Sequence, residues 1–259
     1  MRQTKRFLLA AAVFAIAAAI SSGACSAADR FDAAVSAPGR NAGDDKRDAV
    51  DHPAEVLRLT GIGQRMHVAD VLAGDGYYSE LLAHLVGPQG HVLMINNSSF
   101  DKWSDGPRQK RLADNRLPNV EYQVVDLDHM NLAANSLDAI VLSKVYHDLY
   151  WVDATGEWPK FDVSGVLDQL VTALKPGGVL LLVDHSAKAG HGNSDASTLH
   201  RIEESYAQHD FEKRGLRVIG HSDALRMADD KRDSVSYKPP MLGKTDRFVL
   251  VFRKQGSKH

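Results

Sequence analysis

The sequence predicts an α/β fold in which helices cover both faces of a doubly wound, mostly parallel sheet. Three observations lead to this class. Short apolar runs alternate with stretches of helical spacing between residues 53 and 253, a pattern typical of parallel strands joined by helices. The run at residues 179–183 is apolar throughout, as expected for a strand buried on both faces. The run at residues 66–72 leads directly into glycine-rich sequence, where such a sheet places its ligand.

The individual elements follow in a regular order. A helix is expected to open at Pro53, because proline suits the first turn of a helix. The helix expected at residues 77–86 carries three leucines on one face and stops at a Gly-Pro pair. Further helices are expected at residues 105–116, 163–174 and 197–213. The seven expected strands are residues 66–72, 91–95, 120–125, 137–142, 179–183, 217–220 and 247–253.

The first 28 residues differ from the rest of the chain. Three basic residues precede an unbroken apolar run at residues 7–20, and small residues follow. This order is typical of a secretory signal peptide, whereas a permanent transmembrane helix needs about 20 apolar residues. We therefore expect residues 1–28 to be a signal peptide and the protein to be exported to the periplasm. Cys25 is a candidate for a lipid anchor, although Ser22 stands where an aliphatic residue would be expected.

Composition sets further limits. Residues 29–52 are polar and have no apolar period, which predicts a flexible N-terminal segment ahead of a folded domain at residues 53–259. The net charge of −2 provides no long-range field that would favour nucleic acid. Because Cys25 is the only cysteine, the mature protein would have no disulfide and must rely on its packed core.

The turn after the first expected strand is the strongest candidate for a ligand site. It contains Asp70, Gly74 and Gly76. Glycine lets backbone approach a ligand closely, and the helix that follows points its free amides toward the same place. A tight turn that binds nothing has the same local pattern. A dinucleotide site would need a third glycine where Ser79 stands, which disfavours a nicotinamide-dependent oxidoreductase.

Several segments taken together resemble the successive motifs of class I S-adenosylmethionine-dependent methyltransferases. They are VADVLAGDGYYSELLA, GPQGHVLMINN, LDAIVLSKVYHDLY and LKPGGVLLLVDHSA, in the expected order over roughly residues 53–253. The tail TDRFVLVFRK resembles the last, antiparallel strand of that seven-stranded Rossmann-like sheet. The finer details are similar to a group of predicted exported bacterial methyltransferases whose substrates are not established.

The resemblance implies S-adenosylmethionine as cofactor and a role for each matching position. Gly74 and Gly76 would line the methionine part, and Asp70 would orient the turn or reach the methionine amine. Asn96 stands where an acid usually accepts both ribose hydroxyls. The full expected set of cofactor-binding residues is Asp70, Ala73, Gly74, Asp75, Gly76, Tyr77, Asn96, Asn97, Asp126 and Ser143.

Two positions depart from the family pattern. Leu72 stands at the first glycine, and a leucine held at positive φ costs on the order of 1–3 kcal/mol. Asn96 keeps one acceptor but loses the negative charge, a change that could cost ~1 kcal/mol of binding. These departures keep a second hypothesis open beside methyl transfer to a small acceptor. It is an exported binding protein that retains the fold without catalysis.

The segment after the fourth expected strand holds the candidate catalytic residues Tyr146, His147 and Asp148, and His185 follows the fifth strand. His147 titrates in the range suited to a general base, and Asp148 could orient it. Tyr146 could face the sulfonium cation, as could Tyr77. Core packing of Tyr146 and a structural hydrogen bond of His147 are the alternatives.

A metal site is the last possibility that the sequence raises. Its candidate ligands are spread along the chain, and no HExxH or CxxC spacing connects them. We therefore expect no metal. The candidate ligands are His147, Asp148, His185, His200 and Glu203.

Overall fold

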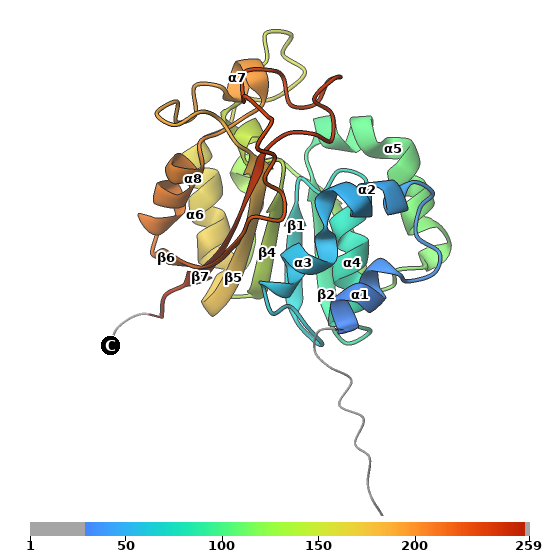
Figure 1. The fold of residues 1–259 in the computed structure, drawn as a ribbon. Coiled ribbons are helices and arrows are strands. Elements are labelled where there is room, and N and C mark those ends of the chain that lie inside the picture. Colours follow the sequence, from blue (N-terminus) through green and yellow to red (C-terminus); the bar gives the residue numbers. More distant parts are fainter. Residues whose placement is uncertain (1–28, 257–259) are drawn as a thin grey trace, which may run out of the picture.

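A twisted sheet of seven strands forms the centre of the fold (Figure 1). In this computed structural model, which describes residues 29–256, the strands lie in the order β3-β2-β1-β4-β5-β7-β6. β7 runs antiparallel to both β5 and β6, and the other neighbours are parallel. The predicted doubly wound sheet with an antiparallel last strand is therefore confirmed. The strands are β1 (His67–Val71), β2 (His91–Asn96), β3 (Val120–Val124), β4 (Leu137–Ser143), β5 (Leu174–His185), β6 (Leu216–Ser222) and β7 (Arg247–Lys254).

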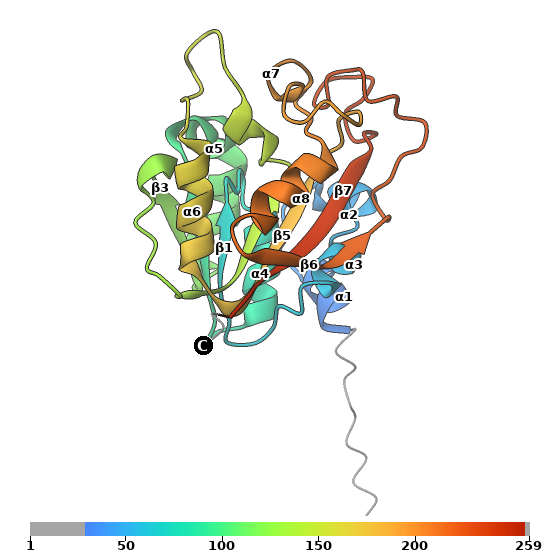
Figure 2. The ribbon, with the colours of Figure 1, turned by 90° about the vertical axis from the view of Figure 1, so that its left-hand side faces the viewer.

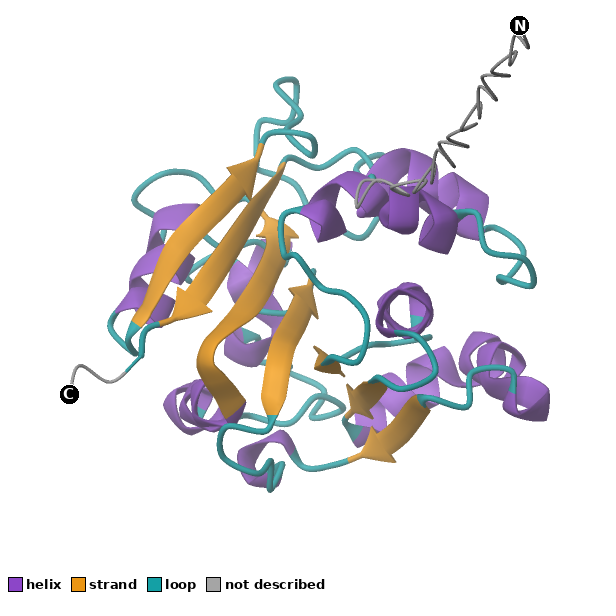
Figure 3. Ribbon diagram, turned by 90° about the horizontal axis from the view of Figure 1, so that it is seen from below, coloured by secondary structure: helices purple, strands orange, loops and turns teal. Residues whose placement is uncertain are grey.

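Helices cover both faces of this sheet (Figures 2 and 3). One face carries α1 (Asp29–Val35), α3 (Pro53–Arg58) and α4 (Tyr77–Val86), and the other carries α6 (Val163–Ala173) and α8 (Glu204–Glu212). Alternate residues of β4 and β5 enter the two cores, as the pleat of a strand requires. The remaining helices are α2 (Asp44–Asp51), α5 (Ser98–Leu112), α7 (Ala196–Leu199) and the short turns η1 (Ala113–Asn115), η2 (Leu127–His129) and η3 (His147–Tyr150).

The chain order places a crevice at the carboxyl ends of β1 and β4. From β1 the chain winds outward through β2 to β3, and then returns to β4 on the other side of β1. Such a reversal leaves the loops after the two central strands diverging in opposite directions, which opens a space for a ligand. The glycine turn and the Tyr146–Asp148 segment both follow these strands.

The prediction of a flexible segment over residues 29–52 is wrong, because these residues form two packed helices. Phe31 of α1 is buried against α3 and α4. α2 lacks an apolar stripe. Instead its first and last residues, Asp44 and Asp51, are buried. Asp44 pairs with Arg111, and Asp51 pairs with Arg247. Hydrophobic periodicity cannot detect a helix that is held by ion pairs.

The single helix predicted over residues 197–213 is also wrong, because the chain breaks between α7 and α8. His200 has a positive φ of 51° at the end of α7. The side chain of the next residue, Arg201, is fully buried and donates to Asp230 and to the Ser186 carbonyl oxygen. That buried pair outweighs helix continuation, so His200 and Glu203 do not share a helix face.

The N-terminal predictions fall outside the part of the chain that the structure describes. The expected signal peptide at residues 1–28, with Cys25, belongs to that undescribed part. Among residues 29–256, every helix is too short or too polar to span a membrane.

Candidate functional site

A cavity of about 410 Å³ lies beyond the carboxyl ends of β4 and β5. Of the predicted catalytic residues, it brings together His147, Asp148 and His185. Four aromatic side chains and a polar loop complete its wall. The other lining residues are Phe100, Trp103, Lys144, Trp151, His200, Ser236 and Tyr237.

His147 is held between two carboxylates at the base of this cavity. Its Nδ1 donates to Asp184 Oδ1 at 2.6 Å, and its Nε2 lies 3.1 Å from Asp148 Oδ1. Burial by itself would lower the pKa of His147, but the charges of Asp148 and Asp184 raise it to about 10. The imidazole is therefore protonated at neutral pH when no other cation is bound, so it cannot act as the predicted general base in that state.

Asp184 fixes the orientation of the His147 ring. It is fully buried at the end of β5, and its carboxylate also accepts the backbone amides of His147 at 2.8 Å and of His185 at 2.7 Å. A carboxylate with three donors is well satisfied inside a protein. Asp184 therefore positions His147 without entering the cavity itself.

The aromatic wall is built from two segments that lie far apart in the sequence. Trp103 of α5 stacks on Trp158 with ring planes 12° apart, and Trp151 stacks on the same ring at 30°. Trp158 is buried and donates its indole N–H to the Asp148 carbonyl oxygen at 2.9 Å. Phe100 completes the wall beside Trp158. The wall therefore offers flat, apolar surface beside the His–Asp pair.

A second cavity of about 510 Å³ adjoins the first and shares Lys144, His185 and Tyr237 with it. Lys144 donates to Asp51 of α2 at 2.6 Å. Burial lowers the pKa of Lys144 to about 8, and the positive charge of Arg47 acts in the same direction. Burial also lowers the pKa of His185 well below its usual range, so this imidazole is neutral.

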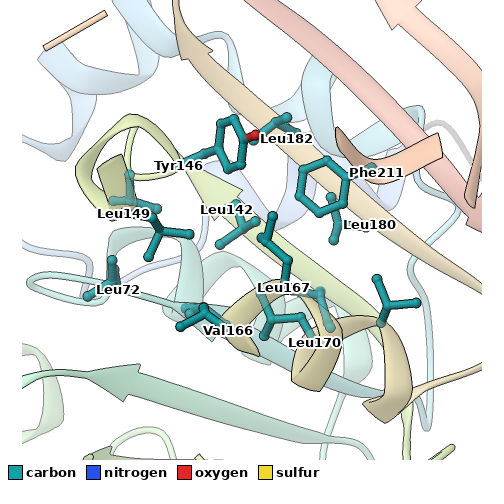
Figure 4. Packing of buried hydrophobic residues seen from close by; sticks show 14 of the residues in the cluster. Leu72, Leu142, Tyr146, Leu149, Val166, Leu167, Leu170, Leu180, Leu182 and Phe211 are labelled. Atoms are coloured by element: carbon teal, nitrogen blue, oxygen red, sulfur yellow. The ribbon is translucent and has the colours of Figure 1, made fainter. Parts of the chain in front are cut away.

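The glycine turn keeps the left-handed backbone that its sequence suggests. Leu72, Gly74 and Gly76 all have positive φ, at 54°, 60° and 82°. The backbone of Leu72 is strained in this conformation, but its side chain is buried among core residues that include Leu149 and Val166 (Figure 4). Its packing explains how leucine is tolerated at a position that favours glycine.

The side chain of Asn96 closes onto the turn. Its Oδ1 accepts from the Gly74 amide at 2.9 Å, and its Nδ2 donates to the Gly74 carbonyl oxygen at 2.8 Å. An aspartate could accept the first bond but could not donate the second. The asparagine therefore fastens the turn to the end of β2, and its amide is already fully used.

Tyr146 and Tyr77 do not reach the cavity, which corrects their predicted roles. Tyr146 is fully buried among core residues such as Leu182 and Phe211 (Figure 4), and its hydroxyl donates to Asp210 at 2.7 Å. Tyr77 donates to Asp48 of α2, with the Arg47 guanidinium 3.9 Å from the ring centroid. Tyr146 thus ties the segment after β4 to α8, and Tyr77 ties α4 to α2.

The remaining predicted cofactor residues lie in different surroundings. Asp75 pairs with Arg111, and Asp126 is exposed and caps η2. Asn97 caps α5 through Oδ1, and its buried Nδ2 has no hydrogen-bond partner among the described residues. Ala73 and Ser143 are half-buried at the ends of β1 and β4. None of these residues lines either of the two cavities.

Asp70 is buried behind the turn rather than facing a ligand. It accepts the Ser79 hydroxyl at 2.6 Å, which ties the end of β1 to α4. Burial raises the pKa of Asp70 to about 7, against about 3.9 in an unfolded chain. The folded state therefore binds more protons than the unfolded state between pH 4 and 7, and stability falls as the pH rises through this window.

Asp70→Asn is expected to stabilise the fold by about 1–3 kcal/mol more at pH 8 than at pH 5, since asparagine avoids the buried charge, whose cost grows up to about pH 7. Urea denaturation at both pH values measures this difference. Asp138→Asn is the control of opposite sign. Burial by itself would raise the pKa of Asp138, but hydrogen bonds from the His67 amide and Lys175 lower it below its usual value. The Asp138→Asn variant should therefore lose stability at pH 8. Equal effects of Asp70→Asn at both pH values would contradict the assignment.

Sequence reasoning missed several residues of this site. Asp184 directly follows the strand expected at residues 179–183, and its position before His185 could have identified it. Nothing in the sequence around Lys144 indicated a role in the site, apart from its position after β4. Ser236 and Tyr237 reach the cavity from the long loop between β6 and β7, which has no strand or helix pattern.

Comparison with known proteins agrees with the fold. Residues 69–182 match the family model described as a methyltransferase domain. A S-adenosylmethionine-dependent methyltransferase from Aquifex aeolicus superposes with a TM-score of 0.58 at 20% identity, over 83% of this chain and 94% of that one. The sheet has the fold of the class I methyltransferases, and the match to the family model lies within residues 69–182. S-adenosylmethionine is the cofactor of this class.

The methyltransferase domain is also similar to proteins named ubiquinone/menaquinone biosynthesis C-methyltransferase UbiE. The protein from Vibrio campbellii is 27% identical over 167 residues, which are 63% of this chain and 55% of the relative. The protein from Haemophilus ducreyi is 25% identical over 50% of this chain and 45% of the relative. The chain thus spans about half the length of these relatives. The [4+2]-cyclase SpnF shares the fold, with a TM-score of 0.59 at 15% identity over 84% of each chain.

The residues around the glycine turn of the methyltransferase domain fit this cofactor. Gly74 leaves its surroundings open, since a Cβ at this position would approach nothing closer than Phe100 at 3.9 Å. The buried amide of Asn97 offers a donor without a partner at the end of β2. Asn97 is therefore better placed than Asn96 to hold a polar group of the cofactor, because the Asn96 amide is used by Gly74.

Proposed function

We propose that the protein is an S-adenosylmethionine-dependent methyltransferase whose acceptor is a small molecule with a flat, apolar ring. The observation that carries this proposal is the position of the cavity. It opens beyond β4 and β5, and Phe100 lies both in its wall and against Gly74 of the glycine turn. When bound at the turn, the cofactor supplies a methyl group on a sulfonium.

The residues of the cavity would hold and align the acceptor. Trp103, Trp151 and Phe100 offer faces on which a ring can stack. Asp148, ionised beside the protonated His147, can accept a hydrogen bond from an acceptor hydroxyl or amine. Holding the two reactants in line is the main contribution that a protein makes to such a transfer. The name of the UbiE relatives, which refers to quinone biosynthesis, is consistent with a ring-shaped acceptor.

A second candidate is a binding protein that retains the fold without catalysis. The contact that favours it is the closure of Asn96 onto Gly74, which occupies the position from which this family usually holds the ribose. Both candidates place a small ligand in the same cavity. Binding of S-adenosylmethionine separates them, because only the methyltransferase requires it.

We also propose that the protein acts outside the cytoplasm, since residues 1–28 have the composition of an export signal. Fractionation of cells that express the full chain, with N-terminal sequencing of the recovered protein, tests this. An intact N-terminus in the cytoplasmic fraction would exclude export.

Gly74→Val is expected to weaken binding of S-adenosylhomocysteine at least tenfold in calorimetry, because the side chain would occupy the bare backbone of the turn. Gly177→Val is the matched control. Gly177 also has positive φ, at 81°, and no atom lies within 4 Å of a Cβ there. Both variants bear a similar backbone strain of about 1–3 kcal/mol, so only a ligand at the turn separates their affinities. No binding by the unaltered protein would favour the second candidate.

A further inference from the structure

The cavity wall contains three side chains whose arrangement goes beyond a hydrogen-bonded pair. The ligand atoms of His147, Asp148 and His200 all lie within 4.8 Å of one another. His147 Nε2 and His200 Nδ1 lie 3.1 Å and 3.2 Å from the same oxygen, Asp148 Oδ1. An ion bound at about 2.0–2.2 Å by each ligand keeps neighbouring ligand atoms roughly 3 Å apart. Both imidazole nitrogens are therefore already as far from the Asp148 oxygen as such an ion requires.

We propose that His147, Asp148 and His200 bind a divalent first-row transition-metal ion at the wall of the cavity. Two imidazoles and one carboxylate suit zinc or iron(II) better than magnesium, which prefers oxygen ligands. The inference does not depend on the proposed methyl transfer. It departs from the sequence-based expectation of no metal because the ligands come from segments 52 residues apart, so no local spacing could reveal them.

The surroundings of His147 match those of a metal-bound histidine. Its Nδ1 donates to Asp184, so Nε2, which faces Asp148, offers a lone pair to an ion once that ion displaces its proton. A carboxylate behind a ligand histidine sets the tautomer and increases its basicity. An ion of charge +2 would also balance the two buried carboxylates, Asp148 and Asp184, whereas one proton on His147 balances only one of them.

His200 is held in place by features that a surface histidine does not need. It adopts positive φ at the break between α7 and α8, and the next residue, Arg201, is anchored by its ion pair with Asp230. Its ring packs between those of Trp151 and Tyr237, with centroid-to-centroid distances of 4.7 Å and 4.6 Å. The fixed ring directs Nδ1 toward Asp148.

The cavity would provide the remaining coordination positions. Three protein ligands leave at least one position of the ion for water or for a polar group of a bound molecule. All three ligands line the cavity, and the aromatic wall lies beside them. A ring hydroxyl of the acceptor could therefore bind the ion while the ring stacks on Trp103 or Trp151.

Zinc titration of the purified protein after removal of metals by a chelator tests the proposal. One equivalent of Zn²⁺ per chain is expected by calorimetry and elemental analysis, and Co²⁺ should give the visible absorption of a site with nitrogen ligands. His200→Ala should weaken Zn²⁺ binding at least 100-fold. Asp184→Asn, behind the ligands, should weaken it 10–100-fold.

His191→Ala is the matched control, because His191 forms a His–Asp pair with Asp195 but has no third ligand beside it among residues 29–256. It should bind Zn²⁺ like the unaltered protein. His200 lies at the cavity edge, so its variant is expected to stay folded, which circular dichroism verifies. Failure to take up one equivalent, or equal affinities of the His200 and His191 variants, would overturn the proposal. Failure of S-adenosylhomocysteine binding alone would not affect it.

Discussion

Replacing Arg111 by leucine is expected to lower the free energy of unfolding by about 3–5 kcal/mol, because the buried carboxylate of Glu80 would keep only Arg116 as an arginine partner. The Arg111 side chain is fully buried and pairs with Glu80, which is equally inaccessible. It also donates to Asp44 and Asp75, each at 2.9 Å. One guanidinium thus joins α5 to α2, to α4 and to the glycine turn.

Thermal and urea denaturation measure this effect, and a loss of about 10 °C in Tm is expected for a domain of this size. Arg108→Leu is the control on the same helix, since its partners Asp101 and Asp105 are 36% and 54% exposed. Exposed pairs contribute about 0–1 kcal/mol. A loss below 1 kcal/mol in Arg111→Leu would show that Arg116 alone compensates the charge of Glu80.

Arg201→Met is expected to have the second large effect, again about 3–5 kcal/mol. Arg201 and Asp230 form a two-pronged pair, at 2.8 Å and 3.2 Å, that is almost completely buried. Without the arginine, Asp230 keeps only the amides of Arg232 and Asp246. The loop that carries Tyr237 should then become sensitive to proteases, because Arg201 also holds the Ser234 carbonyl oxygen.

The double variant Arg201→Met with Asp230→Asn separates the charge from the packing. It removes the unpaired carboxylate, so it should regain about 1–2 kcal/mol over Arg201→Met alone. Urea denaturation of the two single variants and the double variant completes the cycle. Simple addition of the two single losses would mean that the residues act independently.

The sheet could be predicted from the sequence because its signals are local. The helix at residues 77–86 has the observed bounds, since Gly76 and Gly87 with positive φ enclose it. The all-apolar run at residues 179–183 is buried on both faces, as predicted. The break at His200 could not be predicted, because it depends on Asp230, which is distant in the sequence.

The candidate site was predicted only in part, and for a similar reason. Strand ends identify which residues reach the crevice, so His147, Asp148 and His185 were found. The strand ends do not indicate the direction in which a side chain points. Tyr146 points into the core, where its hydroxyl donates to Asp210. Asn96 shows the same limit, since its amide pairs with the neighbouring turn, a contact that residue type alone does not indicate.

The position of β7 has a consequence for how the chain acquires its shape. The last strand in sequence lies between β5 and β6, and β6 has no other neighbour in the sheet. Arg247 at its start also pairs with Asp51, 196 residues earlier. A nascent chain therefore cannot complete its architecture until the final strand emerges from the ribosome. Such late closure leaves the sheet open until synthesis of the domain is almost complete.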